Sequence, residues 1–159
     1  KTKEAKDAKL TPEAQRQQVE KAMATLRDKG SSPYHRNKAV VTLGNSGDMI
    51  VVPILLAELA EGTDPVVKQN TIAALGRLRA KQAVPDLLRL LEAPVTGNVS
   101  DEGEWAAIFR RQAATALGYI GDSSTQPTLK KVMNASNEYQ SVRNAAKSAL
   151  RGLEKTEEQ

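Results

Sequence analysis

The fold is decided by the stretch Phe109-Arg110-Arg111-Gln112-Ala113-Ala114-Thr115-Ala116-Leu117-Gly118-Tyr119-Ile120-Gly121-Asp122. Its Leu-Gly pair recurs at Leu43-Gly44 and Leu75-Gly76, and a fourth copy of its first half ends at Leu150. A proline stands ten residues after each of the first three leucines. The four leucines are 32, 42 and 33 residues apart, and the longest interval contains an irregular stretch, residues 93–103. This period predicts a solenoid of helix pairs, because a single pair of this size does not bury its apolar face alone.

The composition favours helices over sheets. Hydrophobic residues make up 40% of the 159 residues and aromatic residues only 3%, so the core depends on Ala, Leu, Val and Ile. That mixture suits close helix packing. The absence of Cys excludes disulfides and thiol chemistry. No apolar run approaches the roughly 20 residues that span a bilayer, so we expect no membrane insertion. The compartment stays open between cytoplasm and export.

Capping residues and prolines mark where the helices begin. Thr11-Pro12, Ser32-Pro33 and Asp64-Pro65 each combine a side chain that caps free amides with a proline in the first turn. These and similar signals predict eight helices, over residues 12–29, 33–44, 48–61, 65–79, 81–92, 104–119, 122–134 and 137–153. We therefore predict a single all-α domain over residues 11–153, a frayed or disordered arm over 1–10 and a flexible tail over 154–159.

The stretch 109–122 resembles the short HEAT-type repeat named after the phycobilisome lyases. The pattern of that repeat runs Val-Arg-x-x-Ala-Ala-x-Ala-Leu-Gly-x-Ile-Gly-Asp and then Val-Pro-x-Leu-x-x-Leu. The resemblance covers residues 33–153, with departures at Arg79-Ala80 and Arg151-Gly152. It implies a right-handed, slightly curved HEAT-like α-solenoid of about four hairpins, of bacterial type, whose second helices line the concave face.

Positions in the second helix of each pair are counted from the repeat leucine. Positions −8, −4, −1, 0 and +3 are largely apolar and, at 100° per residue, form one core-facing stripe. We expect the glycine at +1 to end this stripe near the turn, and the later proline to lie early in the next helix. The single His, His35, occupies −8 and is expected at the edge of the core rather than as a base or ligand.

The side opposite the core is the candidate binding face. Position −6 holds Asn37, Gln69, Arg111 and Asn144, and position −7 holds Arg36, Lys68, Arg110 and Arg143. The four helices carry ten basic residues and no acid over residues 33–46, 66–79, 106–120 and 139–153. Two interpretations of position −7 stay open: ion pairs within the stack, which we favour, and contacts to an acidic partner. Trp105, beside the irregular stretch, either covers a helix end or contacts a partner.

The sequence contains no catalytic, cofactor or metal motif, so we predict a protein that is not an enzyme, with no cofactor. The favoured hypothesis is a monomeric, non-catalytic scaffold that binds an acidic protein segment on its concave face. Partner-binding residues would be those at −6 and −7, together with Trp105. One alternative is a nucleic-acid-binding module using the same face. Another is a subunit or assembly factor of a bilin lyase or other enzyme.

Overall fold

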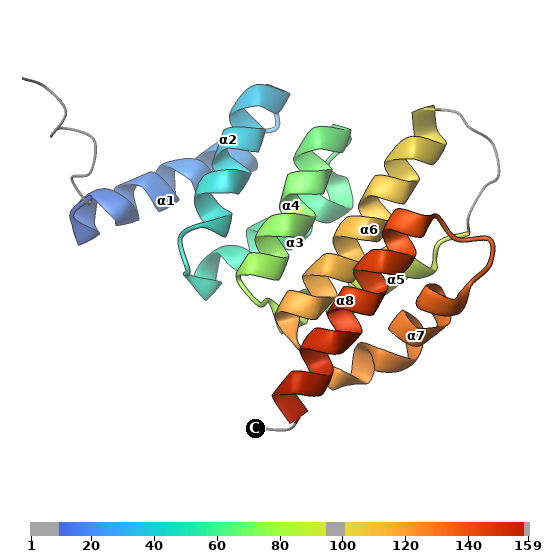
Figure 1. Ribbon diagram of the computed structural model, residues 1–159. Helices are drawn as coiled ribbons and strands as arrows, with labels where there is room; N and C mark the ends of the chain where they lie inside the picture. Colours follow the sequence, from blue (N-terminus) through green and yellow to red (C-terminus); the bar gives the residue numbers. More distant parts are fainter. Residues whose placement is uncertain (1–9, 95–100, 158–159) are drawn as a thin grey trace, which may run out of the picture.

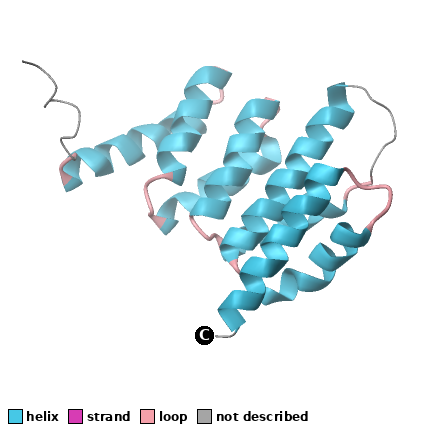
Figure 2. Ribbon diagram, in the orientation of Figure 1, coloured by secondary structure: helices cyan, strands magenta, loops and turns pink. Residues whose placement is uncertain are grey.

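The computed structural model describes residues 10–94 and 101–157, and within these residues every regular element is helical (Figures 1 and 2). The eight α-helices are α1 (Pro12–Arg27), α2 (Pro33–Gly44), α3 (Val52–Glu61), α4 (Pro65–Arg77), α5 (Val84–Glu92), α6 (Asp101–Ile120), α7 (Gln126–Asn134) and α8 (Gln140–Glu157). They pack as four hairpins, α1–α2, α3–α4, α5–α6 and α7–α8. The second helices α2, α4, α6 and α8 lie side by side, with the first helices in a layer behind them (Figure 1). The predicted all-α solenoid of four hairpins is confirmed.

The helix starts follow from the capping residues. The Thr11 side chain accepts a hydrogen bond from the amide of Ala14, Ser32 from that of His35, and Asp64 from those of Val66 and Val67. α3, α5 and α7 are each entered through a short 3-10 turn, over Met49–Val51, Lys81–Ala83 and Ser123–Thr125. In each of the three the repeat proline lies in the first helical turn, where its missing amide breaks no internal bond.

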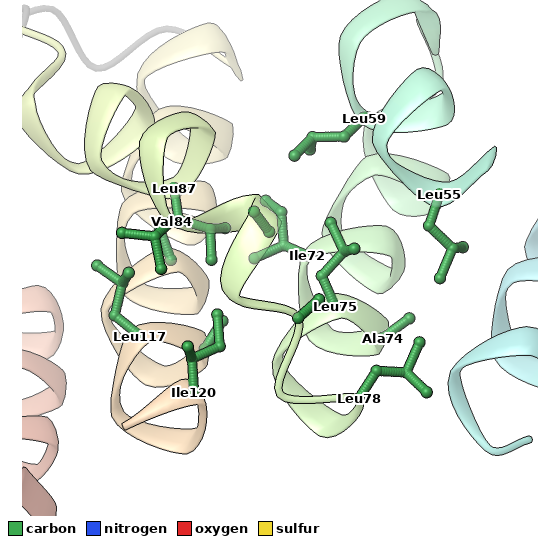
Figure 3. Packing of buried hydrophobic residues seen from close by; sticks show 14 of the residues in the cluster. Leu55, Leu59, Ile72, Ala74, Leu75, Leu78, Val84, Leu87, Leu117 and Ile120 are labelled. Atoms are coloured by element: carbon green, nitrogen blue, oxygen red, sulfur yellow. The ribbon is translucent and has the colours of Figure 1, made fainter. Parts of the chain in front are cut away.

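The core runs through all four hairpins. The repeat leucines Leu43, Leu75 and Leu117 are fully buried, and Leu150 is 5% exposed. Figure 3 shows Leu55 and Leu59 of α3 beside Ile72 and Leu75 of α4, with Val84 and Leu87 of α5 close to Leu117 of α6. Position −3, absent from the predicted stripe, is also fully buried in three repeats, at Val40, Ile72 and Ala114. The stripe is wider than predicted because each second helix packs against its own partner and against the next hairpin.

The glycine at +1 lies near the end of each second helix and serves close packing between hairpins. Gly44, Gly76 and Gly118 stand in the last turn of α2, α4 and α6. A Cβ added to Gly76 would stand 2.9 Å from both Cα and Cβ of Ala116, and one added to Gly118 would meet Ala149 at the same distances. Gly44 approaches Ala74 in the same way. The Leu-Gly element therefore sets the separation of neighbouring second helices.

The turns themselves depend on position +4. Gly47 and Gly121 have φ values of 70° and 75°, in the left-handed region that glycine tolerates. Arg79 occupies this position in the second repeat and adopts φ 52°. The backbone at Arg79 therefore keeps the left-handed conformation of the other repeats, although a residue with a side chain is strained in that conformation.

Several predicted boundaries shift. α6 begins at Asp101, inside the stretch predicted to be irregular, and α8 begins at Gln140 rather than 137. α8 also continues to Glu157, past the boundary at 153 where the flexible tail was expected to start. The rest of that tail, residues 158–159, lies outside the described residues, as do residues 1–9 of the expected arm and 95–100 of the irregular stretch.

Candidate interaction surface

Two of the four cations at position −7 are engaged inside the stack. Arg36 of α2 forms an ion pair with Glu58 of α3, a carboxylate that is 3% exposed. The Arg36 guanidinium also donates to the carbonyls of Asp28 and Leu26, at 2.9 and 3.2 Å. Arg36 thus joins the first hairpin to the second, and its donors are used within the protein.

Arg110 repeats this arrangement between the third and fourth hairpins. It pairs with Glu138, which lies between α7 and α8, and it donates to the carbonyl of Ala93. The side chains of Arg110 and Glu138 are 8% and 1% exposed. Such a buried pair tolerates the loss of neither partner, because the remaining charge would be desolvated and unpaired.

The other two cations have different surroundings. The Lys68 ammonium lies 5.4 Å from the ring centroid of Phe109, a cation–π contact between α4 and α6. Trp105 stacks on the same Phe109, with ring centroids 5.8 Å apart, and is half-buried. Arg143 of α8 donates to the Gln140 side chain at 2.6 Å, while its Nε is buried without a hydrogen-bond partner in the described part of the chain.

The −6 column divides into two halves. Asn37 is half-buried and its side-chain oxygen accepts a 2.7 Å hydrogen bond from Asn70 of α4, and Gln69 beside it is half-buried too. Arg111 is exposed, and Asn144 is exposed and accepts from the Gln140 side chain at 2.8 Å. Asn37 is therefore bonded across to α4, whereas Arg111 and Asn144 face solvent.

The solvent-facing side of the second helices combines cations with apolar side chains. We call the exposed residues Tyr34, Lys38, Val41, Val66, Arg77, Arg111 and Tyr119 the second-helix surface. Its three cations have no hydrogen-bond or ion-pair partner among residues 10–94 and 101–157. Tyr34 is 73% exposed and Tyr119 59%. The apolar part of this surface was not predicted, although Tyr34 and Val66 both stand at position −9, opposite the core stripe.

The single histidine does not lie at the edge of the core. His35 is exposed, with its ring Nδ1 2.8 Å from the Ser32 hydroxyl and its ring edge against Tyr34. It stands in the first turn of α2, three residues after the capping Ser32. Within the described residues, no group of three His, Cys, Asp or Glu side chains could hold a metal ion, and no helix is long and apolar enough to cross a membrane.

The three carboxylates whose pKa values are lowered lie at helix ends. The backbone amide of Gly30 and the Ser31 hydroxyl lower the pKa of Asp28. The exposed Lys29 ammonium lowers the pKa of Glu61. Bonds from the hydroxyl and the backbone amide of Ser124 lower the pKa of Asp122, the N-cap before α7. These carboxylates are thus engaged mainly by donors close to them, with a smaller contribution from Arg36 to the lowered pKa of Asp28 and of Glu61.

Comparison with known families identifies the repeat. The model of HEAT repeats matches residues 19–107, and that of the PBS lyase HEAT-like repeat matches residues 109–135. The chain belongs to the HEAT-repeat family. Among relatives, the HEAT chain is 32% identical to deoxyhypusine hydroxylase of Cryptococcus neoformans over 121 residues, which are 72% of this chain and 31% of that protein. It is 30% identical to phycocyanobilin lyase subunit alpha of Picosynechococcus sp. over 139 residues, 83% of this chain and 50% of that protein.

A solved structure has the same fold. Human deoxyhypusine hydroxylase in complex with glycerol superposes with a TM-score of 0.69 at 22% identity, over 91% of this chain and 46% of that one. The HEAT chain thus spans between about a third and a half of the length of these relatives. Our prediction that the protein is not an enzyme is wrong: one relative is named as an enzyme and another as a subunit of a lyase. The HEAT repeats and these relatives indicate a repeat scaffold or an enzyme-related role.

Proposed function

We propose that this HEAT chain is the recognition part of an enzyme or enzyme complex, and that its second-helix surface binds an acidic protein segment. The observation that carries the proposal is the juxtaposition of three exposed, unpaired cations, Lys38, Arg77 and Arg111, with exposed tyrosines and valines in one layer of helices. A one-signed surface attracts a segment of opposite charge. Aromatic side chains and arginine are the residues enriched where protein interfaces concentrate their binding energy.

The residues of the −6 and −7 positions contribute unequally to this proposed surface. Arg111 and Asn144 face solvent and are available to a partner, whereas Asn37 is bonded to Asn70 of α4 and Gln69 is half-buried. Arg36 and Arg110 form ion pairs with Glu58 and Glu138, so we assign them to the packing between hairpins. Lys68 and the half-buried Trp105 share Phe109 and sit at the margin of the surface.

An association with an enzyme is favoured by the relatives. One of them is a lyase subunit, so a subunit or an assembly factor of an enzyme is the cellular role that we propose for the chain. Recognition of an acidic segment of the companion protein would be the contribution of this surface to such a role.

Nucleic-acid binding is the second candidate, carried by the same three cations. It makes a different prediction, because phosphate contacts release counterions and affinity then falls steeply with salt. A surface that is half apolar favours a protein segment, whose apolar side chains would cover Tyr34 and Val66.

The test uses fluorescence anisotropy with three labelled probes: a peptide alternating Glu with Leu, the same peptide with Lys in place of Glu, and a single-stranded dT20. We expect the acidic peptide to bind best, and Arg77→Glu/Arg111→Glu to weaken it roughly tenfold. Lys21→Glu/Arg27→Glu on α1 is the matched control, since it reverses two exposed charges outside the surface. Tighter binding of dT20 with a steep salt dependence, or equal loss in the control variant, would contradict the proposal.

A further inference from the structure

The α7–α8 hairpin has an outer face, on the side turned away from α5–α6. On the inner side of α8, Ala149 packs closely against Gly118 of α6. Helical geometry places residues two positions away on nearly the opposite side, so Lys147 and Arg151 point away from α6. Both are exposed. In α2, α4 and α6 the corresponding side carries the next hairpin.

Each cation of this face replaces a packing residue of the earlier repeats. Lys147 stands at position −3, where the other repeats have the fully buried Val40, Ile72 and Ala114. Arg151 stands at +1, where they have the glycines that admit the neighbouring helix. On α7, the exposed Lys130 stands three residues after the repeat proline, where α3 and α5 have leucines packed on the core, Leu56 and Leu88.

Arg143 completes the row, one turn before Lys147. In the first three repeats the cation at position −7 contacts the next hairpin: Arg36 contacts Glu58, Lys68 contacts Phe109, and Arg110 contacts Glu138. Arg143 makes only the bond to Gln140 within its own helix, and its buried Nε has no partner among the described residues. It is the one member of the −7 series without a contact to a following unit in the described part of the chain.

A polar cap on a solenoid accounts for the loss of apolar residues here but not for the sign of the charge. Solubility requires polar side chains of any kind. This face instead carries Lys130, Arg143, Lys147 and Arg151 against one described acid, Glu154, one turn beyond Arg151. Three of the cations are spaced i, i+4, i+8 and so form a straight row about 12 Å long on α8.

We propose that the α7–α8 outer face is a second interaction surface, which binds an acidic helix of another protein. The shape argues for a helix, because the equivalent two-helix face of each earlier hairpin receives helices. The charge argues for acidic residues at i, i+4 and i+8, opposite Arg143, Lys147 and Arg151. A second copy of this chain is a poor match, because the exposed acids of its α1, Glu13 and Glu20, are interspersed with the exposed cations Arg16, Lys21 and Arg27 and do not form a row at i, i+4 and i+8. This surface is independent of the second-helix surface.

The test measures binding of a labelled 21-residue Ala-based helical peptide with Glu at every fourth position, by anisotropy. The comparison peptide has the same composition with Glu at every fifth position, so that its carboxylates are spread around the helix and do not form a row at i, i+4 and i+8. We expect the first peptide to bind more tightly, and Lys147→Glu/Arg151→Glu to weaken it roughly tenfold. Exchanging Glu for Lys in the peptide should restore binding to that variant. Arg77→Glu/Arg111→Glu, on the other surface, should leave the affinity unchanged.

Three results would overturn the proposal: equal affinity for the two peptides, no effect of Lys147→Glu/Arg151→Glu, or tighter binding of single-stranded dT20 to this face with a steep dependence on salt. Both substituted residues are exposed, so circular dichroism should show that the variant keeps its helices. Failure of this test leaves the second-helix surface unaffected, since that surface is probed by different substitutions.

Discussion

Replacing Gly76 with Ala tests whether the Leu-Gly element sets the spacing between hairpins. Gly76 lies in α4, and a Cβ at this position would stand 2.9 Å from both Cα and Cβ of Ala116 in α6. Carbon atoms without a bond between them prefer separations of about 3.5–4.0 Å. One of the two opposing atoms belongs to the backbone, so no change of rotamer relieves the contact. The helices must move apart instead.

The size of the effect is the difference between two terms. Overpacking a tightly packed site costs about 1–3 kcal/mol. Ala in place of Gly in a helix interior returns about 1 kcal/mol of helix propensity. We therefore expect Gly76→Ala to lower the free energy of unfolding by up to about 2 kcal/mol, a shift in Tm of about 2–4 °C per kcal/mol for a chain of this size.

Gly152→Ala is the matched control. Gly152 is also inside a helix, α8, but a Cβ there meets nothing within 4 Å. Only the propensity term applies, so this variant should be more stable than the wild type by about 0.5–1 kcal/mol.

Urea unfolding followed by circular dichroism reports all helices, and the fluorescence of the single Trp105 reports α6. If Gly76→Ala were as stable as Gly152→Ala, glycine at +1 would not be required by the packing, and the reasoning would be refuted.

Three further predictions concern charge and backbone strain, each measured by urea unfolding. Glu138→Ala should cost about 3–5 kcal/mol because it leaves Arg110 buried and unpaired, whereas Lys29→Ala, at an exposed pair, should cost less than about 1 kcal/mol; similar losses would contradict this. Arg79→Gly should stabilise the chain by about 0.5–1 kcal/mol, since relief of left-handed strain exceeds the entropy cost of glycine; a loss of stability would count against it. The lowered pKa of Asp122 means that its carboxylate contributes stability above its unfolded-state pKa, a contribution lost as pH falls through the folded-state pKa. Asp122→Asn should therefore lie below the wild type at pH 7 and converge with it at acid pH, and a constant gap would exclude this linkage.

The repeat made the fold predictable because it states the same local structure several times. The caps at Thr11, Ser32 and Asp64 act through residues three or fewer positions away, so a short stretch contains all the information for each helix start. The packing role of glycine at +1 was not predicted, for the opposite reason. Its contact, Ala116 in the case of Gly76, lies 40 residues further along the chain.

The candidate site was predictable in its location and not in its chemistry. Position −7 left two interpretations open because the carboxylates that neutralise Arg36 and Arg110 stand 22 and 28 residues away, on different kinds of element. The burial of Glu58 could have been predicted, since it follows Leu55 at core spacing within an apolar helix. No comparable pattern indicates the burial of Glu138. The exposed tyrosines were missed although Tyr34 and Tyr119 stand at positions −9 and +2, off the predicted core stripe, so the helical period contained a signal that was not used.

The contacts that the cations at position −7 make between hairpins affect the order in which these similar hairpins stack. Each of the first three hairpins has a cation that contacts the next hairpin, and the group contacted differs each time: Glu58 on α3, the Phe109 ring on α6, and Glu138 before α8. If hairpins stacked out of sequence, with the first against the third, Arg36 would meet an aromatic ring instead of a carboxylate, and Glu58 would lose its partner. Misassembly of this kind is a characteristic failure of repeat proteins, and buried polar contacts are known to select one register among several. The apolar stripe is common to all hairpins and would allow them to stack in any order. These three contacts differ from one hairpin to the next, so they favour the native order.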